Sequence, residues 1–166
     1  LKGKVVERMG MKSKYYEFSV KDWRFIVLDG NDVSFHAYPQ NSPKYKDAER
    51  YYRENKIRSP RWNGAVGSEQ VAWLHKILQK AEKQKEQVAV FCHFPVYPAD
   101  PHNLWNAGEI ISLLEEFSCR RSLQRSSPNG SLRFVDFAMN CSIAWVISPK
   151  VNQSSTAQSS TPKAFL

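Results

Sequence analysis

The segment Val88–Pro98, with the sequence VAVFCHFPVYP, decides the fold. Its uninterrupted apolar run predicts a β-strand that is buried on both faces. Two prolines follow, and because proline cannot continue a hydrogen-bonded ladder, we expect the strand to stop at about His93. An imidazole then stands at the carboxyl end of a central strand, where open α/β sheets hold their ligands. A neutral imidazole there can bind a metal ion or transfer a proton, and the alternative is a histidine that only hydrogen-bonds a loop.

The residues before this strand predict the rest of a parallel βαβ unit. Apolar residues recur at helical spacing from Val71 to Ala81, so we expect a helix from Ser68, as its N-cap, to about Gln84. Further upstream, residues 14–20 and 23–28 predict two strands joined by a tight turn. Tyr16, Phe18 and Val20 alternate with polar residues, which is typical of a strand with one buried and one wet face. We interpret the loop 29–32 as a turn whose polar side chains bond to the backbone. It lacks the glycine at the sixth position and the terminal glutamate that a calcium-binding loop needs.

The middle of the chain predicts a long surface connection followed by a second helix. Residues 38–60 are polar and proline-containing, with a short helix expected within 46–55. Asn106 is the expected N-cap of a helix that runs to Phe117, and Glu109 three residues on completes a capping-box pattern.

The apolar pattern ends after Phe117. Residues 118–131 are rich in serine and arginine, residues 132–147 could supply a strand or two, and the Ser/Thr/Gln-rich residues 148–162 predict a disordered tail. We therefore divide the chain into an α/β domain, residues 1–117, and a divergent, mostly irregular C-terminal tail, residues 118–166.

Composition narrows the functional classes. The 166 residues are 42% hydrophobic, enough for one domain with its own core. No apolar run approaches the roughly 20 residues that cross a bilayer, and no signal peptide is visible, so we expect a cytoplasmic protein without a membrane partner. The odd number of cysteines, without metal-type spacing, is consistent with a reducing compartment. Because Leu1 is not an initiator methionine, we expect a piece of a longer chain or an incomplete translation.

The net charge of +8 raises the possibility of an anionic partner. Basic residues between Lys44 and Arg58, and again between Lys76 and Lys85, alternate with acidic ones, which is more typical of solvated faces than of a nucleic-acid patch. Nucleic acid is therefore not the favoured partner.

Several segments in order resemble one family. Four short segments, in this order, are similar to motifs of the calcineurin-like metallophosphoesterases. They are Asn63-Gly64, Glu69-Gln70 with Trp73-Leu74, His93 with its prolines, and Trp105-Asn106. Within that superfamily they most resemble the manganese-dependent ADP-ribose/CDP-alcohol diphosphatases. The resemblance covers roughly residues 13–117.

The resemblance implies a fold and a chemistry. It implies part of a four-layer α/β/β/α sandwich that holds two divalent metal ions, with Mn²⁺ expected, at the strand ends. Two such ions would polarise a phosphoryl group and activate a water molecule. His93 would be one of the metal ligands. Asn63, Gly64, Trp105 and Asn106 would lie near the pocket for a small nucleotide-diphosphate substrate, although a structural role in the loops remains open for all four.

The departures from the family are equally informative. The G-D-x-x-D and G-N-H segments of the family are missing, and no histidine follows His102, so the C-terminal G-H-x-H is missing too. Asp100-Pro101-His102 spells the family's D-x-H, but it follows the His93 strand and is interpreted as a loop. We assign no catalytic residue.

Two functions follow from these observations. The favoured one is a fragment or variant of a phosphodiesterase that hydrolyses the diphosphate bond of ADP-ribose or CDP-alcohols, inactive as an isolated chain because one imidazole cannot hold two cations. The alternative is a non-catalytic basic module that binds nucleic acid or a protein partner. The Arg120-Arg121 pair and the net charge of +8 motivate this second reading.

Overall fold

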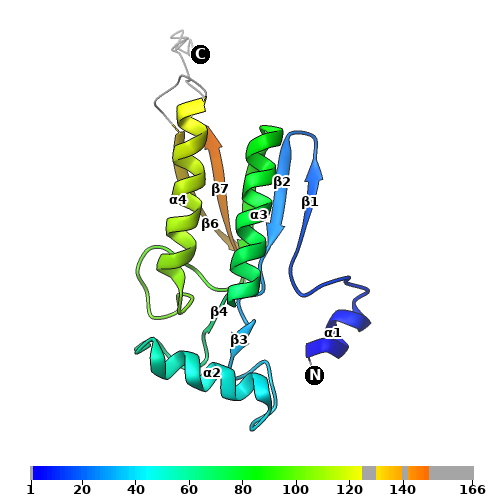
Figure 1. Cartoon of the computed structure of the whole chain (residues 1–166), viewed down its shortest axis with the longest axis vertical. Coiled ribbons are helices and arrows are strands. Elements are labelled where there is room, and N and C mark those ends of the chain that lie inside the picture. The colour runs from blue at the N-terminus through cyan, green and yellow to red at the C-terminus, as the bar shows by residue number, and fades with distance from the viewer. Residues whose placement is uncertain (1, 125–129, 140–141, 150–166) are drawn as a thin grey trace, which may run out of the picture.

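A mixed sheet backed by two helices forms the body of the molecule (Figure 1). The computed structural model describes residues 2–124, 130–139 and 142–149, and the side chains of residues 4–117. The elements along the chain are α1 (Lys2–Arg8), β1 (Tyr16–Val20), β2 (Trp23–Val27), β3 (Val33–Ser34), α2 (Pro43–Glu54), β4 (Gly64–Ala65), α3 (Ser68–Gln84), β5 (Gln87–Cys92), α4 (Ala107–Gln124), β6 (Gly130–Met139) and β7 (Ser142–Pro149). The main sheet has the order β1-β2-β5-β7-β6, and β3 and β4 form a small second sheet.

The predicted βαβ unit is confirmed. β1 and β2 pair antiparallel across a tight turn, with Val20 opposite Trp23. The chain then leaves the sheet, returns through α3, and enters β5, which pairs parallel with β2. β5 ends at Cys92, immediately before His93, as the prolines predict.

Helix α3 has the predicted bounds but not the predicted cap. Its N-cap is Gly67, which has no side chain to offer, and the Gly67 N–H instead donates to Asp32 Oδ2 at 3.2 Å. The carboxylate thus comes from the loop after β2, where it also faces the positive end of the helix dipole. Ser68, the expected cap, is an exposed first residue of the helix.

Helix α2 starts earlier than predicted. Ser42 is its N-cap and accepts from the Tyr45 N–H, and Pro43 occupies the first turn, where its missing N–H costs nothing. The sequence analysis missed the short helix α1 entirely. None of the described helices is long and apolar enough to cross a membrane.

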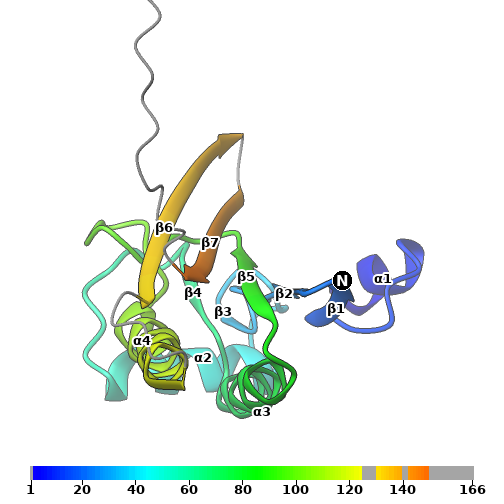
Figure 2. The same cartoon turned by 90° about the horizontal axis from the view of Figure 1, so that it is seen from above.

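Helices α3 and α4 lie side by side on one face of the sheet (Figure 2). On that face the sheet contributes buried apolar residues such as Ile26, Val88, Val90 and Cys92, and the helices contribute Leu74, Leu78, Ile110 and Leu114. These residues form the main core.

The opposite face of β1, β2 and β5 corrects one prediction. Tyr16, Phe18 and Val20 were expected on the buried face of β1, but they are 39, 46 and 51% exposed. Polar Glu17 and Ser19 face the helices instead, because Arg24 and Glu86 bind them there. On the same face of β5, Ala89 is buried and Phe91 is half-buried, so the strand that was predicted to be buried on both faces is enclosed only in part on this one.

The described part of the C-terminal region is more regular than predicted. Helix α4 continues past Phe117 to Gln124 without a break, and β6 and β7 form an antiparallel pair that joins the sheet beside β5. The strands predicted within 132–147 are therefore present, and the expectation of a mostly irregular tail is wrong for this part. β5 has a second edge that needs a hydrogen-bonding partner, and the apolar run 143–147 supplies it. The predicted disordered segment lies almost wholly in residues 150–166, outside the described residues.

A cluster of charged side chains joins β1, β2 and the end of α3 at the edge of the sheet away from His93. Arg24 on β2 is 2% exposed. Its guanidinium donates to Glu17, to Glu86 Oε2 at 2.6 Å and to Gln84 Oε1 at 2.8 Å. Ser19 donates to the other oxygen of Glu86 at 3.1 Å. The cluster ties β1, β2 and the end of α3 together.

We expect Arg24→Met to lower the free energy of unfolding by about 3–5 kcal/mol, because it leaves the buried Glu86 without its cation and the half-buried Glu17 with only Lys80. Urea denaturation followed by circular dichroism would measure the loss. Lys80→Met is the control, since Lys80 pairs with Glu17 from a half-exposed position, and it should cost at most about 1 kcal/mol. Equal losses in the two variants would contradict a special role for the buried cation.

Candidate functional site

The predicted site lies where β2 and β5 end. The two strands are parallel and in register, with Val27 opposite Phe91, and the Leu28 N–H donates to the Phe91 carbonyl at 2.8 Å. Asp29 and His93 therefore leave the sheet at the same edge. The His93 side chain is exposed, with its ring centre 4.9 Å from that of Phe94 in an edge-on arrangement. This placement is the one a ligand-binding imidazole requires, and the metal role of His93 stays a prediction.

The described side chains do not complete a metal site. Among residues 4–117, no group of three histidine, cysteine, aspartate or glutamate side chains lies close enough to hold a metal ion. His93 fits as one ligand of a metal ion, but the described residues alone do not fit a two-metal centre.

Two buried amides clamp the loops behind this edge. Gln70 on α3, with 0% exposure, accepts from the Asp29 N–H at 2.8 Å and donates to the Asp29 carbonyl at 3.1 Å. Asn106 does the same to Val66: its Oδ1 accepts from the Val66 N–H at 3.1 Å and its Nδ2 donates to the Val66 carbonyl at 2.9 Å. Each side-chain amide thus bonds to both the N–H and the carbonyl of one residue, as the backbone of a neighbouring strand would.

Two more amides hold the loop after His93. Asn63 is fully buried, and its Nδ2 donates to the carbonyls of Pro101 at 2.6 Å and Asn103 at 2.9 Å. Asn103 in turn donates to the carbonyls of Val96 and Pro98. Together they fix the path of the chain from β5 to α4.

Gly64 is required by a close approach of two backbones. A Cβ atom on Gly64 would lie 2.3 Å from the Gly30 carbonyl oxygen and 2.9 Å from that of Val33. Any side chain there would push the loop after β2 away from β4.

Trp105 anchors helix α2 to the site. Its ring contacts Phe35, Tyr51 and Tyr52, its indole N–H donates to the Pro60 carbonyl at 3.1 Å, and its backbone N–H donates to the Gly64 carbonyl at 2.9 Å. Burial, followed by the charge of Glu109, raises the pKa of Tyr51 in this cluster.

The structure thus brings Asn63, Gly64, Trp105 and Asn106 together behind the strand ends. Their contacts support the structural role that the sequence left open, and substrate binding by these residues stays a prediction. Asn106 also differs from a capping box, since its side chain bonds to Val66 and to Glu109 Oε2. The sequence analysis assigned no role to Gln70, although it lies in the motif, since only the fold shows which backbone it meets.

The loops near the site behave as predicted. The Asp29 carboxylate accepts from the Asn31 N–H at 3.0 Å, which confirms turn chemistry for residues 29–32. Asp100 accepts from the His102 backbone N–H at 2.8 Å and lies 2.7 Å from the His102 ring. These contacts lower the pKa of Asp100, so the pair is a local loop bridge.

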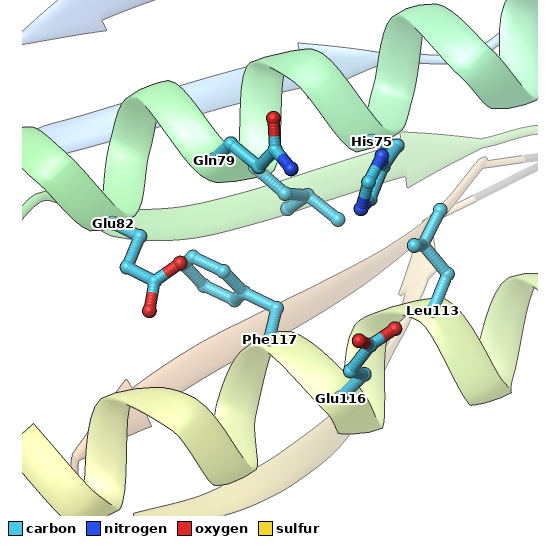
Figure 3. Close-up of a pocket in the computed structure, with 7 residues that line it drawn as sticks. His75, Gln79, Glu82, Leu113, Glu116 and Phe117 are labelled. Carbon is cyan, nitrogen blue, oxygen red and sulfur yellow. The ribbon is translucent and has the colours of Figure 1, made fainter.

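Hollows on the described part of the chain lie away from His93. A small groove between α3 and α4 is lined by His75, Leu78, Gln79, Glu82, Leu113, Glu116 and Phe117 (Figure 3). A more open polar hollow beside the start of α3 is lined by residues of both charges, including Asp32, Lys44, Arg50 and Glu69. Because its charges are mixed, it favours neither an anion nor a cation.

Comparison with known proteins finds similar sequences that all carry one name. The chain is 28% identical over 141 residues to a manganese-dependent ADP-ribose/CDP-alcohol diphosphatase from Oryza sativa subsp. japonica, covering 71% of the chain and 44% of that protein. It is 32% identical over 121 residues to the protein of the same name from Xenopus tropicalis, covering 63% of the chain and 35% of the relative. No family model matches the chain.

A solved structure agrees. The fold is similar to a dimetal phosphatase from Danio rerio, with a TM-score of 0.55 and 27% identity, over 61% of the chain and 39% of that structure. The predicted resemblance is confirmed. The mixed α/β fold predicted with it is confirmed too. The chain spans less than half the length of each of these relatives.

We expect Gln70→Leu to lower the free energy of unfolding by about 1–3 kcal/mol, because the Asp29 N–H loses its bond to the buried amide and the Asp29 carbonyl, which also accepts from the Asp32 N–H, loses one donor. Gln79→Leu on the exposed side of the same helix is the control and should change it by less than about 0.5 kcal/mol. Urea unfolding measures both. Equal stability of the Gln70 variant and wild type would show that the clamp contributes nothing.

Cys92 should be inert in the folded chain. Burial raises the pKa of its thiol to about 12. We expect a Cys119→Ser/Cys141→Ser variant to resist iodoacetamide at neutral pH and to react fully in urea. Because the folded pKa is raised, the contribution of this thiol to stability is complete below about pH 9 and is lost as pH rises toward 12. Fast labelling of the native variant at neutral pH would contradict this.

Proposed function

We propose that the chain is part of a metal-dependent hydrolase that cleaves the diphosphate bond of a small nucleotide substrate. The relatives named above are manganese-dependent ADP-ribose/CDP-alcohol diphosphatases, and the structural neighbour is a dimetal phosphatase. The single observation that carries the proposal is His93, exposed at the end of a central parallel strand, within the set of motifs on which the family resemblance rests.

In this proposal His93 is one metal ligand, and the divalent metal is Mn²⁺. The buried amides act as positioning residues. Gln70 and Asn106 fix the loops after β2 and before α3, and Asn63 fixes the loop that follows His93. The edge from which the imidazole projects is therefore rigid before any ligand arrives.

The isolated chain is proposed to be catalytically incompetent. Since the described side chains supply no group of three potential ligands, they do not fit a two-metal centre, and no catalytic step can be assigned to them. The remaining metal ligands would have to come from the part of the relatives' sequence that this chain does not cover.

The basic-module alternative gains no specific support from the structure. Arg50 bonds to Asp47 at 2.5 Å and Lys80 bonds to Glu17 at 3.2 Å, so cations on both helices already have acidic neighbours. Retention on a nucleic-acid matrix at low salt would be the observation in its favour.

We expect the purified 166-residue chain with added Mn²⁺ to hydrolyse ADP-ribose and a CDP-alcohol no faster than its His93→Ala variant. The reason is that a single imidazole cannot hold two cations. Release of the nucleoside monophosphate, followed by chromatography, measures the rate, and a complete diphosphatase from one of the relatives is the positive control. Turnover near that of the complete enzyme, lost in His93→Ala, would contradict incompetence while supporting the metal role of His93.

A further inference from the structure

The chain continues to alternate between core and surface after β5 has ended. Cys92, Phe94 and Val96 belong to the main core, whereas His93 and Tyr97 are exposed. The imidazole at the strand end is therefore flanked in sequence by two residues whose side chains are held by close packing. One of them, Phe94, places its ring against the imidazole.

The two rings lie close together although their residues are neighbours in sequence. Successive side chains of an extended strand point to opposite faces. Here the backbone bends at His93 and Phe94, and the ring centres are 4.9 Å apart with the ring planes at 67°. Aromatic pairs prefer this edge-to-face arrangement, because it brings the positive edge of one ring to the negative face of the other. The contact therefore favours one orientation of the imidazole before any ligand binds.

The ring of Phe94 is itself enclosed. It is 8% exposed, and the Leu104 N–H donates to the Pro95 carbonyl at 2.9 Å, which holds the backbone beside it. A Cβ atom on Gly30, in the loop after β2, would lie 2.8 Å from Phe94 Cδ2 and 3.0 Å from Cys92 Sγ. Gly30 thus leaves the space that the Phe94 ring fills, and any side chain there would displace the ring.

We propose that Phe94 is a positioning residue that fixes the orientation of the His93 imidazole at the sheet edge, and that Gly30 acts through it by leaving room for its ring. The inference rests on the proposed function, in which His93 is a metal ligand. A mobile imidazole gives up rotamer freedom when it binds a metal ion, and an imidazole already held by a neighbouring ring gives up less. The expected gain in metal affinity is about two- to tenfold, the range of one immobilised side chain or one aromatic pair.

Nuclear magnetic resonance of the histidine side chains in the 166-residue chain tests the proposal, and His93→Ala identifies the His93 signals. Without metal, we expect Phe94→Leu to remove the ring-current displacement of the His93 ring protons and to leave the signals of His36, another exposed histidine, unchanged. On titration with Mn²⁺ we expect broadening of the His93 signals, with a dissociation constant about two- to tenfold higher in the variant. Gly30→Ala keeps Phe94 but displaces its ring, so it should change both quantities in the same direction.

Two matched controls isolate the ring contact. Phe91→Leu makes the same change two residues before His93, at a ring that stacks on the neighbouring strand. Gly108→Ala matches Gly30→Ala, because a Cβ atom on Gly108 would meet nothing within 4 Å. Both controls should leave the His93 shifts and the Mn²⁺ dissociation constant unchanged.

Circular dichroism and thermal unfolding show whether each variant is folded, and Gly30→Ala carries the test if Phe94→Leu is not. Unchanged His93 signals in a folded Phe94→Leu or Gly30→Ala variant would overturn the proposal, and so would equal changes in the two controls. Mn²⁺ broadening that both variants leave unchanged would overturn it as well, although the metal role of His93 would stand. If Mn²⁺ does not broaden the His93 signals of the wild type, the proposed metal role fails, and the shifts measured without metal still decide the role of Phe94.

Discussion

The site depends on side-chain amides that pair with backbone. Gln70 and Asn106 each offer one donor and one acceptor to the N–H and carbonyl of a single residue, as a neighbouring strand would. A loop that crosses a buried region must satisfy its backbone polar groups, and these loops do so in part through side-chain amides. Removing either amide therefore breaks two hydrogen bonds to the backbone at once.

These clamps explain why the recognisable motif has its particular residues. Trp105-Asn106 lies far in sequence from Asn63-Gly64 and Gln70, yet it bonds to Gly64 and Val66 in the segment that joins them. Gly64 allows two backbones to meet, and its carbonyl accepts from the Trp105 N–H. The motif is thus mainly a set of supports for the strand ends, and His93 is the member of it that points outward.

Much of the fold could be predicted from local patterns. The apolar run before His93, the proline stop and the helical spacing from Val71 to Ala81 all act within one element, so they predicted β5, α3 and their parallel pairing with β2. What could not be predicted depends on distant partners. The Gly67 N–H at the start of α3 donates to Asp32 from another loop, and Glu17 on β1 binds Arg24 of the neighbouring strand. The placement of His93 followed from its strand, whereas the clamping role of Gln70 required knowledge of where Asp29 would lie.

The burial of the Asn63-Gly64 pair has a chemical consequence. An asparagine followed by glycine is the dipeptide most prone to deamidation, since the glycine nitrogen can attack the side-chain amide when the backbone is free to bend. Here Gly64 is paired with Ser34 in the small sheet, and the Asn63 amide nitrogen is held by two carbonyls. Deamidation of Asn63 therefore requires the loop to open first. Deamidation would place a carboxylate against the two carbonyl oxygens that had accepted hydrogen bonds, which disfavours the closed loop.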